Sequence, residues 1–190
     1  MVILINGIMM SVWYYRAHYS IYDIMMSTKF QDAIRPRSST NPSPAGEAVT
    51  ELILSLFRVN NLLLTAGDRL VQGLGLTSAR WQVLGAIAYA DRPQPVAWLA
   101  RDMGANRQNV QRIINDLNEA GLVTFQINPH HRRAQLVVLT DKGKQAFDAA
   151  MRLQGPWVKD LVQGLAPKDI KTAHGVLTTL RQRLDGKGAA

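Results

Sequence analysis

The segment from residue 107 to residue 115 carries side chains that hydrogen-bond the edges of nucleic-acid bases. Six of its nine residues are arginine, glutamine or asparagine: Arg107, Gln108, Asn109, Gln111, Arg112 and Asn115. Arginine binds guanine through two hydrogen bonds, and glutamine and asparagine bind adenine in the same way. An ordinary solvated helix face, the alternative interpretation, usually mixes acidic with basic residues, and this segment holds no acid. The composition therefore favours a surface that contacts nucleic acid.

The apolar residues of this region recur at the spacing of an amphipathic helix. They follow the i, i+3, i+4, i+7 pattern: Val110, Ile113, Ile114, Leu117 and Ala120. This pattern predicts a helix from Arg107 to Ala120 that turns the six polar residues outward. Asn106 is a suitable N-cap, because its side-chain oxygen accepts a free backbone N–H of the first turn. Gly121 is suited to end the helix.

A shorter helix precedes this one, and a glycine separates the two. From Val96 onward, apolar residues fall where two short helices would face a shared core. Ala100 is expected at the crossing, since a larger side chain there would push the helices apart. Gly104 suits the turn because glycine adopts positive φ without strain. The region from Val96 to Asn115 is therefore predicted to be a helix-turn-helix.

Two β-prone runs follow, at residues 122–127 and 134–139. The loop between them starts with Asn-Pro, which initiates turns, and ends with Arg132 and Arg133. We expect a hairpin whose two guanidinium groups bind phosphates or enter a minor groove. A helix-turn-helix followed by such a hairpin forms a winged helix.

Long helical patterns flank the winged helix on both sides. They run from Glu47 to about Gln72, from Asp141 to about Leu165, with Thr140 as N-cap, and from Pro167 to Leu184. Paired with those of a second copy, they would bury enough surface for an obligate dimer; a monomeric helical cap is the alternative. The predicted fold class is mainly α: a winged helix-turn-helix, with a three-helix core and a β-hairpin wing, flanked by N- and C-terminal dimerisation helices.

At roughly residues 47–185 the chain resembles the MarR-type transcriptional regulators. The motifs are Leu76-Thr77, Trp81, Val83-Leu84, Asn115-x-Leu117-x-x-x-Gly121-Leu122-Val123, Asn128-Pro129, Arg133 and Leu139-Thr140-x-x-Gly143. The resemblance implies a homodimer whose recognition helices occupy successive major grooves while the wings reach the flanking minor grooves. By position, Arg133 matches the wing arginine of the family's Asp-x-Arg motif. His131 stands where that motif has aspartate, so the motif's carboxylate partner is missing.

The same resemblance implies that a small aromatic or phenolic ligand can release the repressor from DNA. Such a ligand would lie where the dimerisation helices meet the winged helix. The residues we place there are Trp81, Trp98, Tyr89 and Arg80. Both tryptophans have a structural alternative, because they lie on apolar faces of predicted helices, where tryptophan usually belongs to the core.

The composition agrees with a polyanionic partner. The chain has 190 residues, a formal net charge of +8 and a pI near 10.1, which suits nucleic acid or an acidic membrane surface. The absence of cysteine excludes disulfides, thiolate zinc sites and cysteine nucleophiles. His130 and His131 have no Cys, Asp or Glu nearby to complete a metal site. Ser55 and Ser78 have no histidine at a catalytic spacing, so we expect no enzyme, no cofactor and no metal.

The first 45 residues differ in character from the rest. Residues 35–46 are rich in proline, serine and threonine, which is typical of a flexible linker. Residues 1–15 hold no charge, but they lack a basic n-region and fall short of the ~20 residues of a spanning helix. We therefore expect a cytoplasmic protein without signal peptide or membrane anchor, and Met26 as an alternative start.

The predicted domains are an extension and linker at 1–45 and a MarR-type domain at 46–185. Within the MarR-type domain, the dimerisation helices are predicted at 46–76 and 141–185 and the winged helix-turn-helix at 77–140.

The sequence thus predicts a homodimeric, sequence-specific regulator of double-stranded DNA. We expect a repressor that occupies a pseudo-palindromic operator and blocks polymerase. Base contacts are assigned to Gln108, Asn109, Gln111 and Arg112, and backbone or minor-groove contacts to Arg107, Arg132 and Arg133. The alternative is a winged-helix module that binds another protein and holds DNA only weakly and without sequence preference.

Overall fold

The computed structural model describes residues 43–131 and 133–186. The chain divides into two units, one ending at Leu63 and the other beginning at Leu64. The predicted extension and linker up to residue 42, the alternative start at Met26 and the wing residue Arg132 lie outside the described residues.

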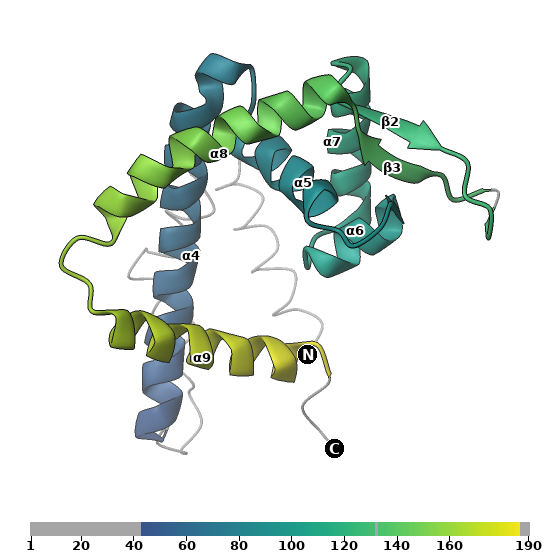
Figure 1. Ribbon diagram of the computed structural model, residues 1–190. Helices are drawn as coiled ribbons and strands as arrows, with labels where there is room; N and C mark the ends of the chain where they lie inside the picture. Colours follow the sequence, from purple (N-terminus) through teal and green to yellow (C-terminus); the bar gives the residue numbers. More distant parts are fainter. Residues whose placement is uncertain (1–42, 132, 187–190) are drawn as a thin grey trace, which may run out of the picture. The chain divides into compact units, whose positions relative to one another are not determined.

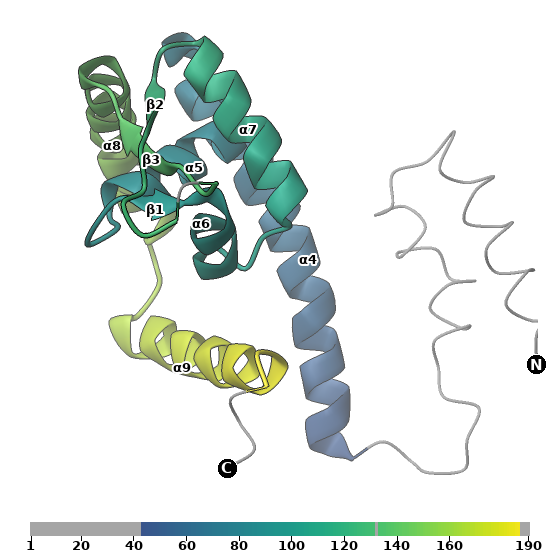
Figure 2. The ribbon, with the colours of Figure 1, turned by 90° about the vertical axis from the view of Figure 1, so that its right-hand side faces the viewer.

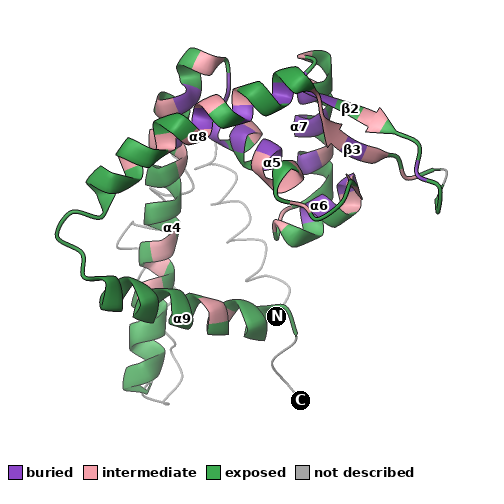
Figure 3. Cartoon of the chain, viewed as in Figure 1, coloured by how far each residue is buried: buried purple, intermediate pink, exposed green. Residues whose placement is uncertain are grey.

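The predicted N-terminal helix is confirmed as α4, Pro44–Val71, which the short 3-10 helix η1, Gln72–Leu74, continues (Figure 1). Most of α4 is exposed in the single chain (Figure 3). Its exposed large apolar residues are Val49, Ile53, Phe57, Val59, Leu62 and Leu63. By length and composition alone, the segment Pro44–Leu74 is also apolar enough to cross a membrane, as are core helices of many soluble proteins.

Three helices form the centre of the second unit: α5, Ser78–Ala88, α6, Val96–Asp102, and α7, Arg107–Glu119. Each of the three contacts the other two. The side chains between them are at most 2% exposed and include Val83, Leu84, Leu99, Val110, Ile114 and Leu117. Ala100 is equally buried, which agrees with the predicted need for a small residue where α6 crosses α7.

The predicted caps and turns of the helix-turn-helix are confirmed. Asn106 precedes α7, and its side-chain oxygen accepts the backbone N–H groups of Gln108 and Asn109 at 2.9 and 3.3 Å. Gly104 in the turn and Gly121 after α7 have φ of 62° and 69°, values that side chains with a Cβ rarely adopt. Local side-chain chemistry therefore fixes where α7 begins and ends.

The wing belongs to a three-stranded antiparallel sheet of order β1-β3-β2. The strands are β1, Gln94–Pro95, β2, Val123–Gln126, and β3, Leu136–Leu139. The hairpin of β2 and β3 was predicted, but its strands are shorter than expected, because a turn held by the loop's own hydrogen bonds occupies their distal ends. Strand β1 was not predicted, since two residues carry no periodic signal. Figure 1 shows the hairpin projecting away from the three helices, and Figure 2, in which the hairpin points toward the viewer, shows β3 between β1 and β2.

Two helices complete the chain: α8, Asp141–Leu161, and α9, Pro167–Leu184. Helix α8 begins against the end of α7, where a Cβ on Gly143 would collide with the carbonyl oxygen of Leu122. The predicted N-cap Thr140 accepts the N–H of Gly143 at 3.0 Å and donates its hydroxyl proton to the carbonyl of Gly121 at 2.8 Å. The expected end of α8 near Leu165 is wrong, because the helix stops at Leu161 and a turn containing Gly164 follows.

Candidate nucleic-acid interface

Helix α7 separates a buried apolar face from an exposed polar face. Val110, Ile113, Ile114 and Leu117 are at most 6% exposed. The predicted DNA-contacting residues lie on the other sides of the helix, where all but the half-buried Gln111 are exposed. The helical repeat of 3.6 residues places Gln108, Arg112 and Asn115 along the line farthest from the core. This face is available to a partner without any unfolding of the helix.

One flank of α7 faces the wing across a hollow of about 320 Å³. Its lining includes Arg107, Gln111 and Asn115 from α7 and Arg133 and Gln135 from the wing. The hollow therefore brings three residues of α7 that are predicted to contact DNA next to Arg133 of the hairpin. In the sequence, Arg133 is at least 18 positions away from each of the three. The sequence assigned the two groups independently, and the structure brings them to one surface.

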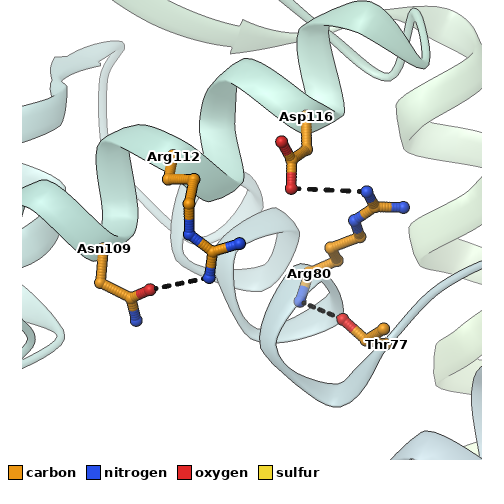
Figure 4. A network of polar contacts seen from close by, with 5 residues as sticks. All are labelled: Thr77, Arg80, Asn109, Arg112 and Asp116. Atoms are coloured by element: carbon orange, nitrogen blue, oxygen red, sulfur yellow. Dashed lines mark hydrogen bonds and ion pairs between the residues drawn. The ribbon is translucent and has the colours of Figure 1, made fainter.

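The polar side chains of α7 hydrogen-bond one another. Gln111 donates through Nε2 to Oδ1 of Asn115 at 2.9 Å. Arg112 donates through Nη2 to Oδ1 of Asn109 at 3.1 Å, as Figure 4 shows. These contacts hold the side chains in defined rotamers on the exposed face, which lowers the entropy lost when a ligand fixes them.

The other flank of α7 contacts α5 through an ion pair. Nη2 of Arg80 lies 3.5 Å from Oδ2 of Asp116, and the two side chains are 32% and 35% exposed (Figure 4). The backbone N–H of Arg80 donates to Oγ1 of Thr77, the N-cap of α5. Arg80 was assigned to a ligand site, whereas the structure places its guanidinium beside the recognition helix.

The wing loop is closed by a buried asparagine. Asn128 is 8% exposed; its Nδ2 donates to the carbonyl of Ala134 at 2.9 Å, and its Oδ1 accepts the N–H of His130 at 3.0 Å. The Asn-Pro pair predicts a turn here, whereas the cross-loop bond to Ala134 follows only from the structure. Arg133 is exposed, and among the described residues no carboxylate forms an ion pair with it. Asn128 therefore fixes the loop that presents this arginine.

The four residues assigned to a ligand site lie in different surroundings. Trp81 is a core residue at 9% exposed, as its structural alternative predicted. Tyr89 is 73% exposed and meets Phe147 edge-on, with 5.7 Å between ring centroids. Trp98 is 43% exposed, so its structural alternative, a place in the core, is wrong.

Trp98 is part of an aromatic and cationic cluster at the base of the wing. The guanidinium carbons of Arg92 and Arg101 each lie 5.7 Å from the Trp98 ring centroid, within cation–π distance. Next to this cluster is a hollow of about 420 Å³. It is lined by Arg92, Pro93, Pro95, Trp98, Asn128, Pro129, His130, His131, Ala134 and Leu136. The lining is mostly apolar, and its polar groups include the guanidinium of Arg92, the amide of Asn128 and two imidazoles.

Within residues 43–131 and 133–186, no group of three or more His, Cys, Asp or Glu side chains is placed to hold a metal ion. The polar side chains on the outer face of α7 and around the two hollows carry guanidinium, amide and imidazole groups. These groups donate hydrogen bonds to phosphates and to base edges.

Comparisons with known proteins identify a family. Residues 74–134 match the MarR family. An uncharacterized protein of Mycobacterium tuberculosis is 37% identical over 103 residues, which cover 54% of this chain and 71% of that protein. The transcriptional activatory protein BadR of Rhodopseudomonas palustris is 32% identical over 107 residues, covering 54% of this chain and 59% of BadR.

Solved structures show the same fold. AbsC, a MarR family transcriptional regulator from Streptomyces coelicolor, is 19% identical with a TM-score of 0.65, and the match covers 78% of this chain and 99% of AbsC. CouR from Rhodococcus jostii RHA1, bound to p-coumaroyl-CoA, is 21% identical with a TM-score of 0.61, and the match covers 68% of this chain and 90% of CouR. The sequence matches, the winged helix and the polar face of α7 lead to one conclusion: the chain belongs to the MarR family of DNA-binding transcriptional regulators.

Proposed function

We propose that the protein is a homodimer that binds a pseudo-palindromic operator, with the two copies of α7 in successive major grooves. The observation that carries this proposal is the face of α7, where arginine and amide side chains stand exposed beside the wing hollow that contains Arg133. Arg112 and the amides of α7 would contact base edges, while Arg107 and Arg133 would bind phosphates or the minor groove. The protein would act on DNA in the cytoplasm.

Dimerisation is supported by the apolar surface that the single chain leaves exposed. On α4, Ile53, Phe57 and Leu62 are 40%, 50% and 64% exposed. On α9, Ile170, Leu177 and Leu184 are 43%, 37% and 87% exposed. Large apolar surfaces of this kind usually mark an interface, and two-fold symmetry of the protein matches a palindromic site.

Repression would follow from occupancy, because a dimer that covers the operator excludes polymerase. The name of one relative, the transcriptional activatory protein BadR, describes the opposite effect for that protein. A reporter gene behind the selected operator distinguishes the two. We expect expression to rise when the regulator is removed; a fall would show activation.

A small aromatic ligand would weaken this repression. The hollow at the base of the wing supports the idea, since Trp98 offers a stacking surface and Arg92 a positive charge. CouR, which shares the fold, was solved with p-coumaroyl-CoA bound. The ligand could shift the equilibrium only by its difference in affinity for the DNA-binding and the released conformations.

Selection of bound sequences from a pool of random duplexes tests the function directly. We expect a symmetric motif whose half-sites lie about one helical turn apart, bound by two chains. A pool that shows no enrichment would favour the alternative of a protein-interaction module. Salt-dependent footprinting adds a second criterion, because nonspecific binding protects no defined site and weakens steeply with salt.

A further inference from the structure

The recognition helix has a polar flank opposite the wing. Asn109, Arg112 and Asp116 are spaced by three and four residues and therefore form one stripe along α7. Arg80 of α5 lies at the end of this stripe, in contact with Asp116 (Figure 4). Its guanidinium is thus a positive group at the edge of the face assigned to DNA, supplied by a different helix.

We propose that Arg80 binds a DNA phosphate, and that Asp116 holds its guanidinium in the free protein and releases it when DNA binds. This inference rests on the proposed function, because it assumes that the outward face of α7 enters a groove. Both side chains are about one-third exposed, so a phosphate oxygen has access to the guanidinium without displacement of the core.

The ion pair is suited to such an exchange. A carboxylate and a guanidinium 3.5 Å apart at the surface stabilise a protein little, because water and salt screen their attraction. A phosphate offers the same guanidinium two oxygens in a planar, bidentate arrangement. The backbone of Arg80 is fixed in the first turn of α5 by Thr77, so only the side chain has to move.

Asp116 has a second consequence for DNA binding. A carboxylate next to the recognition face repels phosphates, and pairing with Arg80 cancels that charge in the free protein. When Arg80 moves to a phosphate, the pairing is lost, and this loss reduces the gain from the new contact. Asp116 therefore lowers affinity for every duplex, whatever its sequence, both by its own charge and by competing for Arg80.

A double-mutant cycle on the full chain tests whether Arg80 exchanges Asp116 for a phosphate. Arg80→Gln, Asp116→Asn and the double variant would be titrated with the selected operator and with a scrambled duplex from 50 to 200 mM salt. We expect Arg80→Gln to weaken binding to both duplexes about three- to tenfold and to flatten the salt slope by about one unit. Asp116→Asn should strengthen binding in both backgrounds, and more in the wild-type chain than in the Arg80→Gln variant, because only the wild-type chain loses the ion pair on binding.

Arg101 provides a matched control. It too is an arginine paired with an aspartate, since its Nε lies 3.2 Å from Oδ1 of Asp102, but its side chain is 71% exposed and it lies on α6 next to Trp98. Arg101→Gln removes the same charge and should leave the salt slope unchanged. An equal change of slope in both variants would mean that net charge alone is responsible, which overturns the proposal.

Two further results would overturn it. If Asp116→Asn strengthens binding equally with and without the Arg80→Gln substitution, Asp116 repels DNA directly and does not act through Arg80. If Arg80→Lys, which keeps the charge, flattens the slope as much as Arg80→Gln, the arginine has a structural role only. A wild-type protein that binds neither duplex would contradict the proposed function instead.

Discussion

At the scale of single residues, the amide and arginine side chains of α7 are ordered before DNA arrives. The bonds from Gln111 to Asn115 and from Arg112 to Asn109 link residues three or four positions apart, as neighbouring turns of a helix allow. Contact with a base requires these internal bonds to be exchanged for bonds to the base edge. The exchange favours only those sequences whose donors and acceptors replace what was lost, which is a source of specificity.

Truncation of the central arginine tests the contact with bases. Arg112→Ala should weaken binding to the selected operator by about 1–3 kcal/mol and relax the preference at one base position, because a bidentate contact to one base pair is lost. Fluorescence anisotropy with the operator and with single-base variants measures both effects. The assigned role is wrong if the loss is equal on operator and random DNA.

Arg133 is expected to behave differently, because a phosphate contact carries no sequence information. Arg133→Ala should weaken binding to all duplexes alike and flatten the salt slope by about one unit. The ratio of affinities for operator and scrambled DNA, measured over a range of salt, should stay constant. A change in that ratio would place Arg133 in contact with a base or in a minor groove whose width depends on sequence.

At the scale of elements, the start of α8 is joined tightly to the end of α7. Gly143 approaches the carbonyl of Leu122 so closely that no Cβ fits. Nearby, Thr140 donates to the carbonyl of Gly121, and Nζ of Lys142 donates to the carbonyl of Ala120 at 2.8 Å. These bonds satisfy carbonyls that the end of a helix leaves free. They also fix the direction in which α8 leaves the winged helix.

A methyl group at this contact should be costly. Gly143→Ala is expected to lower the free energy of unfolding by about 3 kcal/mol, because backbone on both sides has to shift. Gly175→Ala, in the middle of α9, is the control: nothing lies within 4 Å of its Cβ position. That variant should gain about 0.5–1 kcal/mol from improved helix propensity. Urea denaturation measures both, and equal stabilities would contradict the close contact.

At the scale of the whole molecule, the described chain leaves more apolar surface exposed on α4 and α9 than a monomer usually does. The buried core includes Val83, Leu99 and Ile114 of the winged helix together with Val71 of α4 and Phe147 of α8. The large apolar residues named above on α4 and α9 are exposed. The flanking helices therefore contribute to the core and still present apolar side chains that a second copy could cover.

A charge within the exposed band of α4 should prevent pairing. Phe57→Glu is expected to shift the protein from dimer to monomer in analytical ultracentrifugation and to reduce operator affinity at least tenfold, because two half-sites are no longer bound together. Phe57→Leu, which keeps the position apolar, is the control and should leave the dimer intact. A dimeric Phe57→Glu variant would show that α4 does not pair through this residue.

The sequence by itself determined the helices and most of their ends, with the end of α8 as an exception. The apolar spacing of α7, the cap at Asn106, the turn at Gly104 and the hairpin after Gly121 follow from interactions between residues close together in the chain, which sequence patterns record directly. Only the tertiary structure decided that Arg80 lies beside Asp116, that Trp98 is exposed and that Asn128 closes the wing. Each of these depends on how elements pack, and the same side chain on the same helix face is buried or exposed according to what the fold places against it.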